Sequence, residues 1–164
     1  MKASREAEYT EYVQGRLTWL RRTAYLLCQD WPEADDLVQT AITRLYANWG
    51  RARDASSLDA YTRAILVRVF LSERRSAWSR RVTVGGGYPE EPAKSPDHDA
   101  VMDVRAALST LPPRQRATIV LRFYCDLPIE DTAQALGVTT GTVKSQTAKG
   151  LAALRASLEP AMEA

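Results

Sequence analysis

Residues 129–151 read IEDTAQALGVTTGTVKSQTAKGL, and their apolar residues recur with helical spacing on both sides of a glycine. Two helices that meet at a steep angle need a small residue where their backbones approach and a glycine in the turn. Ala133 and Gly137 stand at these positions, and Val143 can return an apolar side chain into the angle between the helices. The stretch therefore predicts a helix-turn-helix, although the same spacing also fits a helical hairpin with solvated polar residues.

The second helix of this motif carries polar side chains suited to reading duplex DNA. In a helix-turn-helix the second helix projects from its domain and can enter the major groove, with its N-terminal residues nearest the base edges. The polar side chains of this helix are Thr142, Lys144, Ser145, Gln146 and Lys149. Gly150 follows them inside the helix, where glycine costs about 1 kcal/mol relative to alanine. We therefore expect the last helix to be packed less firmly than its counterparts in similar proteins.

Downstream of residue 100 the predicted helices are short and are separated by proline and glycine. Two consecutive prolines end the first of them, another proline opens the third, and Thr139 or Thr140 can cap the fourth. The predicted spans are 101–111, 114–124, 129–136 and 142–158.

Upstream of residue 82 three longer helices are predicted, over 9–27, 30–49 and 56–81. Asp30 and Glu33 have capping-box spacing at the start of the second helix. Ser56 or Ser57 can cap the third. Apolar and polar residues nowhere alternate over enough positions to predict a strand. The sequence therefore predicts an all-α protein in two helical bundles.

Residues 82–100, VTVGGGYPEEPAKSPDHDA, separate the two predicted bundles. They hold three consecutive glycines and three of the eight prolines of the chain, and too few large apolar residues to cover a core. We therefore expect a flexible acidic linker between a first domain over 1–81 and a second domain over 101–164.

The net charge of +2 over 164 residues hides an alternation of sign along the chain. Residues 1–48 sum to −1, residues 51–81 to +5, residues 82–103 to −4 and residues 104–164 to +2. Because each domain presents few cations, each alone is expected to bind DNA weakly. Two such contacts joined by a tether reinforce each other when both are held on a common partner.

The sequence offers no enzyme, metal or membrane signature. Its two cysteines, Cys28 and Cys125, lie far apart beside apolar neighbours, which favours buried reduced thiols over a disulfide. His98 is the only histidine, so no Cys/His zinc cluster can form, and the common phosphate-loop and hydrolase motifs are absent. No apolar run approaches a membrane span, and the N-terminus is polar. We expect a cytoplasmic, non-catalytic protein without cofactor, metal or membrane partner.

Two segments and the two-domain layout resemble the extracytoplasmic-function branch of the sigma-70 family. The segments are DLVQTAITRLY (36–46) and LPPRQRATIVLRFYCDLPIEDTAQALGVTTGTVKS (111–145). Members of this branch are small bacterial sigma factors with only the domains called region 2 and region 4. The resemblance implies binding to core RNA polymerase and to promoter DNA with −35 and −10 elements. As a family-level expectation, it also implies regulation by an anti-sigma factor that masks both domains.

The resemblance assigns polymerase docking to the second predicted helix. In the family this helix binds a basic coiled coil of the largest polymerase subunit, and here it presents Asp35, Asp36 and Gln39. The two acids near the helix N-terminus also complement the helix dipole, so part of their presence has a purely structural explanation.

The resemblance further implies that the −10 element is bound as melted single strand by the loop over 50–57 and the basic third helix. Such binding needs positive charge along the backbone and polar or aromatic groups for unpaired bases. The candidates are Arg51, Arg53, Ser56, Ser57, Tyr61, Arg63, Arg68, Arg74 and Arg75. For the −35 duplex, the family pattern adds Arg122 to the polar side chains of the helix-turn-helix.

Two other functions remain open on the sequence alone. A stand-alone helix-turn-helix regulator would use residues 1–81 for dimerisation or sensing, and would bind a two-fold operator tightly without polymerase. A helical interaction protein would show no salt-dependent binding to DNA. The 36–46 segment and the basic third helix favour the sigma factor over both. The acidic linker is then either an inert tether or a mimic of nucleic acid inside the polymerase.

Overall fold

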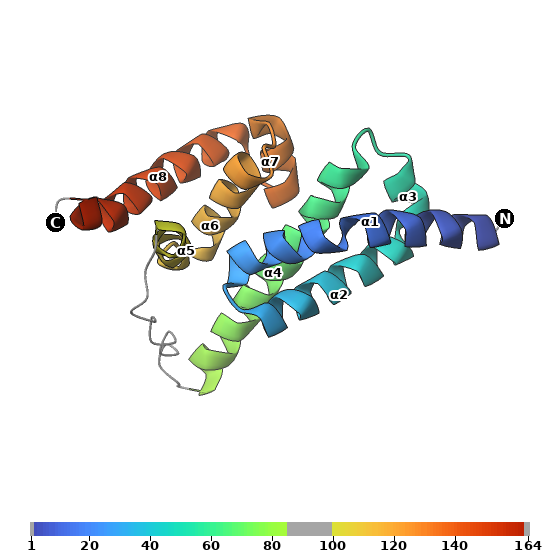
Figure 1. Ribbon diagram of the computed structural model, residues 1–164, viewed down its shortest axis with the longest axis horizontal. Coiled ribbons are helices and arrows are strands. Elements are labelled where there is room, and N and C mark those ends of the chain that lie inside the picture. The colour runs from blue at the N-terminus through green and yellow to red at the C-terminus, as the bar shows by residue number, and fades with distance from the viewer. Residues whose placement is uncertain (1, 85–99, 163–164) are drawn as a thin grey trace.

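The computed structural model describes residues 2–84 and 100–162, and every regular element in these two ranges is helical (Figure 1). The first group of helices comprises α1 (Lys2–Cys28), α2 (Trp31–Ala47), α3 (Trp49–Arg53) and α4 (Leu58–Val84). The second group comprises α5 (Ala100–Ser109), α6 (Pro113–Ile119), the π-helix η1 (Val120–Tyr124), α7 (Ile129–Leu136) and α8 (Thr140–Met162). The predicted all-α fold in two helical groups is confirmed, while most of the predicted linker lies outside the described residues.

The two groups of helices pack against each other. In Figure 1, α1 and α2 run side by side and α4 crosses them, while α5 to α8 occupy the other end of the molecule. Helix α7 lies on α4, and α5, α6 and η1 all contact α1. The sequence predicted two bundles on a tether, and this contact between them was not predicted.

The helix starts that were predicted from the sequence have the expected caps. The Asp30 carboxylate accepts a hydrogen bond from the Glu33 amide at 3.0 Å, at the N-terminus of α2. The Ser57 hydroxyl accepts one from the Ala60 amide at the start of α4. Gly137 ends α7 with φ of 68°, a left-handed conformation that glycine adopts without strain.

Helix α3 takes in residues 50–53 of the expected loop, together with Trp49 at the end of the second predicted helix. Trp49 and Ala52 are buried there with Val13 of α1 and Leu45 of α2. Residues 49–53 include Gly50, which disfavours a helix. Burial of the large indole side chain outweighs this propensity, and the loop that remains before α4 is only four residues long, 54–57.

Helix α8 packs closely on α6 at Gly150. Gly150 is buried, and a Cβ atom at this position would lie 2.9 Å from Cγ1 of Ile119. The glycine therefore lets the two helices approach more closely than any larger residue would allow. Its cost in helix propensity is offset by this contact.

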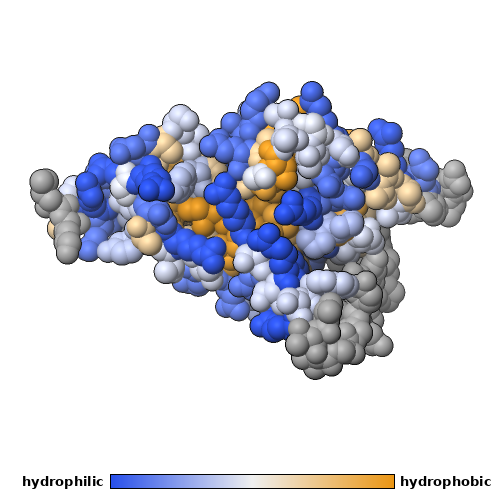
Figure 2. All heavy atoms as spheres, turned by 180° about the vertical axis from the view of Figure 1, so that it is seen from behind, coloured by the Kyte–Doolittle hydropathy of each residue, from blue (hydrophilic) through white to orange (hydrophobic). Residues whose placement is uncertain are grey.

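One hydrophobic core runs through both groups of helices. Its buried members include Leu20 of α1, Phe70 of α4, Val120 and Leu121 of η1, and Ala135 of α7. Figure 2 shows apolar residues gathered across the middle of one face, with hydrophilic residues around them. On α1, Leu20, Ala24 and Leu27 are fully buried, whereas Leu17 keeps 40% of its surface exposed.

Candidate nucleic-acid interface

The helix-turn-helix is formed by α7, a three-residue turn and α8. Ala133 and Val143 are buried, as the angle between the two helices requires. The Thr139 hydroxyl accepts a hydrogen bond from the Thr142 amide at 3.1 Å and so caps α8. This arrangement fixes the direction in which the polar side chains of α8 leave the domain.

The predicted −35 contacts on α8 differ in exposure. Lys144, Ser145 and Lys149 are exposed. Thr142 is half-buried, and its hydroxyl lies 3.0 Å from the Thr139 hydroxyl. Gln146 is also half-buried. The surface available to duplex DNA is thus centred on two lysines and a serine.

Arg122 lies in η1 rather than in the helix-turn-helix. Its guanidinium is half-buried and donates a short hydrogen bond to the carbonyl oxygen of Leu127. It also lies 5.9 Å from the centre of the Phe123 ring. The residue therefore helps to fix the turn that leads into α7.

The predicted polymerase-docking residues all lie on the surface of α2. Asp36 and Gln39 are exposed and, three residues apart, share one face of the helix. Asp35 is exposed as well and forms an ion pair with Arg21 of α1 at 2.7 Å. The Arg21 guanidinium also lies 4.4 Å from the Trp31 ring centre. A basic partner could approach this face without displacing core residues.

Around the turn between α3 and α4 the structure gathers part of the predicted −10 set. Arg51, Arg53, Ser56 and Ser57 are exposed there. Arg53 pairs with Glu8 at 3.0 Å, and the Ser57 hydroxyl is engaged in its helix cap. Tyr61, by contrast, is half-buried against the cluster around Trp49.

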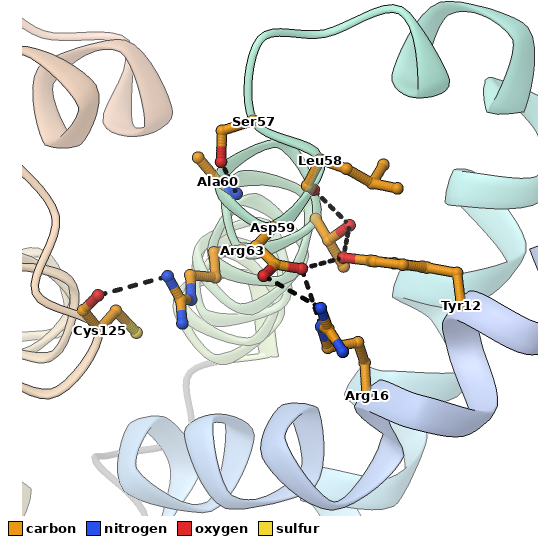
Figure 3. Close-up of polar contacts among 9 residues, drawn as sticks. Tyr12, Arg16, Ser57, Leu58, Asp59, Ala60, Arg63 and Cys125 are labelled. Carbon is orange, nitrogen blue, oxygen red and sulfur yellow. Dashed lines mark hydrogen bonds and ion pairs between the residues drawn. The ribbon is translucent and has the colours of Figure 1, made fainter.

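A polar network that the sequence analysis did not anticipate ties the start of α4 to α1 (Figure 3). Asp59 accepts hydrogen bonds from the Tyr12 hydroxyl at 2.7 Å and from Nε of Arg16 at 2.9 Å. The Tyr12 hydroxyl also lies 3.0 Å from that of Thr62, which is fully buried. The spacing of Tyr12 and Arg16, one helical turn apart on α1, was the available sequence signal.

The ionisation of this network follows from its contacts. Burial, with a smaller contribution from the Asp59 charge and its hydrogen bond, raises the pKa of Tyr12 to about 12. Burial acts to raise the pKa of Asp59, but hydrogen bonds from Arg16 and Tyr12 outweigh it, and that pKa lies below its ordinary value. The carboxylate is therefore charged at neutral pH and anchors the N-terminal end of α4.

The predicted −10 arginines on α4 differ in their partners and in exposure, with Arg68 and Arg75 exposed and Arg63 and Arg74 half-buried. Arg63 lies 4.1 Å from the centre of the Trp19 ring and donates to the Cys125 carbonyl. Arg68 reaches carbonyl groups at the end of α7. Arg74 forms an ion pair with Glu33, whereas Arg75 is exposed. The sequence groups these arginines because all are positively charged. In the structure Arg63, Arg68 and Arg74 each contact a different partner.

Both cysteines are buried free thiols, as predicted. Burial raises the pKa of Cys28 to about 11 and also raises the pKa of Cys125. Within the described ranges, no three His, Cys, Asp or Glu side chains are grouped as a metal site would need. None of the helices in residues 2–84 and 100–162 combines the length and apolarity that a bilayer span requires.

The fold is all-helical, and its helix-turn-helix presents exposed cations. These features are typical of a DNA-binding protein. Comparison with known families narrows this class. The model of sigma-70 region 2 matches residues 12–80, and that of sigma-70 region 4 matches residues 107–156. The chain belongs to the sigma-70 family.

Individual relatives support the same placement. The RNA polymerase sigma-E factor of Streptomyces coelicolor is 37% identical over 160 residues, covering 92% of this chain and 86% of that protein. An extracytoplasmic-function sigma factor, EcfG of Rhodopseudomonas palustris, is 32% identical over 142 residues, covering 85% of this chain and 78% of that protein. The chain is thus an RNA polymerase sigma factor of the extracytoplasmic-function group, and a stand-alone regulator is not favoured.

Solved structures have the same fold. The sigma factor RpoE of Bartonella quintana, crystallised with the anti-sigma factor NepR, aligns with a TM-score of 0.79. It is 26% identical, and the alignment covers 93% of this chain and 97% of that one. CnrH, solved with the cytosolic domain of CnrY, aligns with a TM-score of 0.63 at 18% identity, covering 94% of this chain and 90% of that one.

Proposed function

We propose that this sigma factor divides promoter recognition between its two groups of helices. The α2 surface around Asp36 and Gln39 docks on core polymerase, the turn before α4 holds melted −10 DNA, and α8 reads the −35 duplex. The domain limits 1–81 and 101–164 follow this division. The observation that carries the proposal is the exposure of Lys144, Ser145 and Lys149 at the start of a capped α8.

The proposed function assigns no chemical step to the chain itself. We expect no catalytic activity, because the polymerase performs the chemistry and melting draws on the binding of unpaired bases. The site of action is the cytoplasm, where transcription takes place. The likeness to RpoE, solved with NepR, supports control of this chain by an anti-sigma factor of its own.

Run-off transcription tests the proposal directly. Purified protein added to core polymerase is expected to start transcription from promoters that carry spaced −35 and −10 elements. Core polymerase alone is the control. Absence of any product across a genomic promoter library, together with tight binding of the protein alone to a palindromic site, would overturn it in favour of a stand-alone regulator.

A further inference from the structure

Gln146 of α8 has a side-chain oxygen that the free chain leaves without a hydrogen bond. The residue as a whole is half-buried, but its Oε1 atom is buried and no donor of the described residues reaches it. A buried acceptor without a partner costs free energy, whereas an apolar side chain of similar size would fill the space without this cost. Packing of the free chain therefore does not explain why the residue is a glutamine.

Gln146 lies at the border between the buried and the exposed face of α8. Val143, three residues earlier, is fully buried, whereas Ser145 and Lys149 are exposed. Residues three and four apart share a face of a helix, so Gln146 lies between Thr142 and Lys149 along this border. A glutamine side chain is long and rotates about several bonds, so its amide can turn from the buried to the exposed side. There it joins the side chains that are proposed to face duplex DNA.

A small hollow between α6 and α8 brings a cation close to this amide. The hollow is lined by Arg114 and Thr118 of α6 and by Thr142 and Gln146 of α8. Arg114 is exposed and forms no ion pair with a carboxylate in residues 2–84 and 100–162. It lies in the first turn of α6, where the helix dipole disfavours a positive charge. The contacts of the free chain therefore do not explain this arginine either.

The amide of glutamine matches one base of duplex DNA. Its oxygen accepts a hydrogen bond and its NH2 group donates, while adenine presents a donor at N6 and an acceptor at N7 in the major groove. Guanine presents two acceptors there, cytosine a donor and thymine an acceptor, so adenine alone satisfies both halves of the amide. A guanidinium group beside the groove suits a phosphate oxygen instead.

We propose that Gln146 reads an adenine of the −35 duplex through N6 and N7, and that Arg114 binds a phosphate beside it. The inference rests on the proposed function of α8 and adds the base that one of its residues selects. On binding, the amide turns out of the hollow, and its oxygen gains the donor that it lacks in the free chain. Arg114 extends the phosphate-binding surface to α6, outside the two helices of the helix-turn-helix.

Base preference of the polymerase-bound protein tests the role of Gln146. Holoenzyme made from core polymerase and the full-length chain is bound to promoter duplexes randomised across the −35 element, and the bound duplexes are sequenced. The unmodified protein is expected to enrich adenine at one position by about tenfold, and Gln146→Ala to lose the preference at that position alone. Gln146→Glu should prefer cytosine there, because a carboxylate accepts a hydrogen bond from N4 of cytosine. Gln134→Ala, which alters an exposed glutamine of α7, is the matched control and should keep adenine.

A modified base separates direct contact from recognition of DNA shape. The base 7-deazaadenine has a carbon in place of N7 and still pairs with thymine. At the selected position it should weaken binding of the unmodified protein several-fold and leave binding of Gln146→Ala nearly unchanged. Equal weakening in both proteins, or weakening in neither, would refute the contact, because adenine would then be preferred through the shape of the duplex.

The salt dependence of duplex binding tests Arg114. Arg114→Ala should reduce the salt slope by about 1 and weaken binding to all −35 sequences alike, because a phosphate contact does not distinguish bases. Arg155→Ala, which removes an exposed cation further along α8, is the control. Equal slopes for the Arg114→Ala and unmodified proteins would exclude the phosphate contact.

Failure of this inference is distinct from failure of the proposed function. Run-off transcription from promoters with spaced −35 and −10 elements, together with no adenine preference that depends on Gln146, would refute the base contact alone. Absence of transcription from every promoter would refute the sigma-factor assignment as well. Circular dichroism of each variant confirms that the helices are retained.

Discussion

Asp59 is the residue on which the polar contacts between α1 and α4 converge, and its charge should make stability depend on pH. Its pKa in the folded protein lies below the ordinary value of 3.8 because of Arg16 and Tyr12. The carboxylate therefore contributes stability that is fully present above pH 3.8 and is lost as the pH falls through the lower folded pKa. Above pH 3.8, Asp59→Asn should unfold at lower urea concentration than the unmodified protein.

The check on this pH dependence is a series of urea titrations at decreasing pH. The difference between Asp59→Asn and the unmodified protein should shrink below pH 3.8. Asp54→Asn, which alters an exposed carboxylate in the neighbouring turn, is the control and should show no comparable pH dependence. A difference that stays constant in acid would remove Asp59 from this role.

Gly150 allows a prediction in which a helix-favouring substitution lowers stability. Gly150→Ala brings a methyl group against Ile119, and overpacking should lower the free energy of unfolding by about 1 kcal/mol. In an Ile119→Ala background the contact is relieved, and the same substitution should raise it by about 1 kcal/mol through helix propensity. Chemical denaturation of the four proteins gives the double-mutant cycle. Equal effects of Gly150→Ala in both backgrounds would contradict the close approach.

Individual caps could be predicted from the sequence, whereas the partners of charged side chains could not. Asp30, Ser57 and Thr139 each accept a hydrogen bond from the amide three residues later, so local spacing identifies them. Arg63 and Arg68 act on groups more than sixty residues away. Their grouping as DNA contacts rested on charge and on the family resemblance, and neither specifies a partner within the chain.

Helix α8 should carry most of the positive charge that binds duplex DNA. Lys149→Ala is expected to weaken binding of the polymerase-bound protein to −35 duplex DNA and to reduce the salt slope by about 1. Arg155→Ala, an exposed cation further along α8, is the control and should leave the slope unchanged. Fluorescence anisotropy over a range of salt concentrations measures both. An unchanged slope for Lys149→Ala would exclude a phosphate contact.

The exposed face of α2 leads to a prediction about polymerase. Asp36→Arg reverses a charge that is expected to face a basic surface, and affinity for core polymerase should fall by about tenfold or more. Glu11→Arg makes the same reversal at an exposed position of α1 and serves as the control. Biolayer interferometry with immobilised core enzyme gives both affinities. If the two variants lose affinity equally, α2 is not the docking element.

The elements themselves were largely predictable, and the exceptions have physical reasons. Apolar periodicity located the helices because each buries one face. Helix α3 was missed because five residues with an internal glycine carry little periodic signal, and only tertiary burial of Trp49 stabilises it. The π-helical winding of η1 was missed because it depends on packing at the end of α6 and leaves no spacing of its own.

For the whole molecule, the shared core predicts one cooperative unfolding transition. Residues of α1, α2 and α4 are buried together with residues of α6, η1 and α7, so neither group keeps its full core when the other unfolds. Scanning calorimetry should give a single peak whose calorimetric and van't Hoff enthalpies agree. Two resolved peaks would show that the groups unfold independently.

The packing of the two groups is the feature that the sequence could least predict. The composition of the linker favoured two separated bundles. Apolar residues with helical spacing show that one face of a helix is buried, but they do not show which helix covers that face. The acceptors of Arg63, Arg68 and Arg116 are main-chain carbonyl groups, which every residue possesses. No residue type therefore marks the docking position.

The contact of Arg63 with Trp19 has an optical consequence. All four tryptophans, Trp19, Trp31, Trp49 and Trp78, belong to the first group of helices, so indole emission reports on that group alone. Arg63 covers the Trp19 ring, and one of its terminal nitrogens donates to the Cys125 carbonyl of the second group. When the groups separate, Arg63 loses its carbonyl acceptor on the second group, and the changed surroundings of the Trp19 ring should shift its emission. The chain thus carries a built-in fluorophore that can follow domain docking in real time without an attached dye.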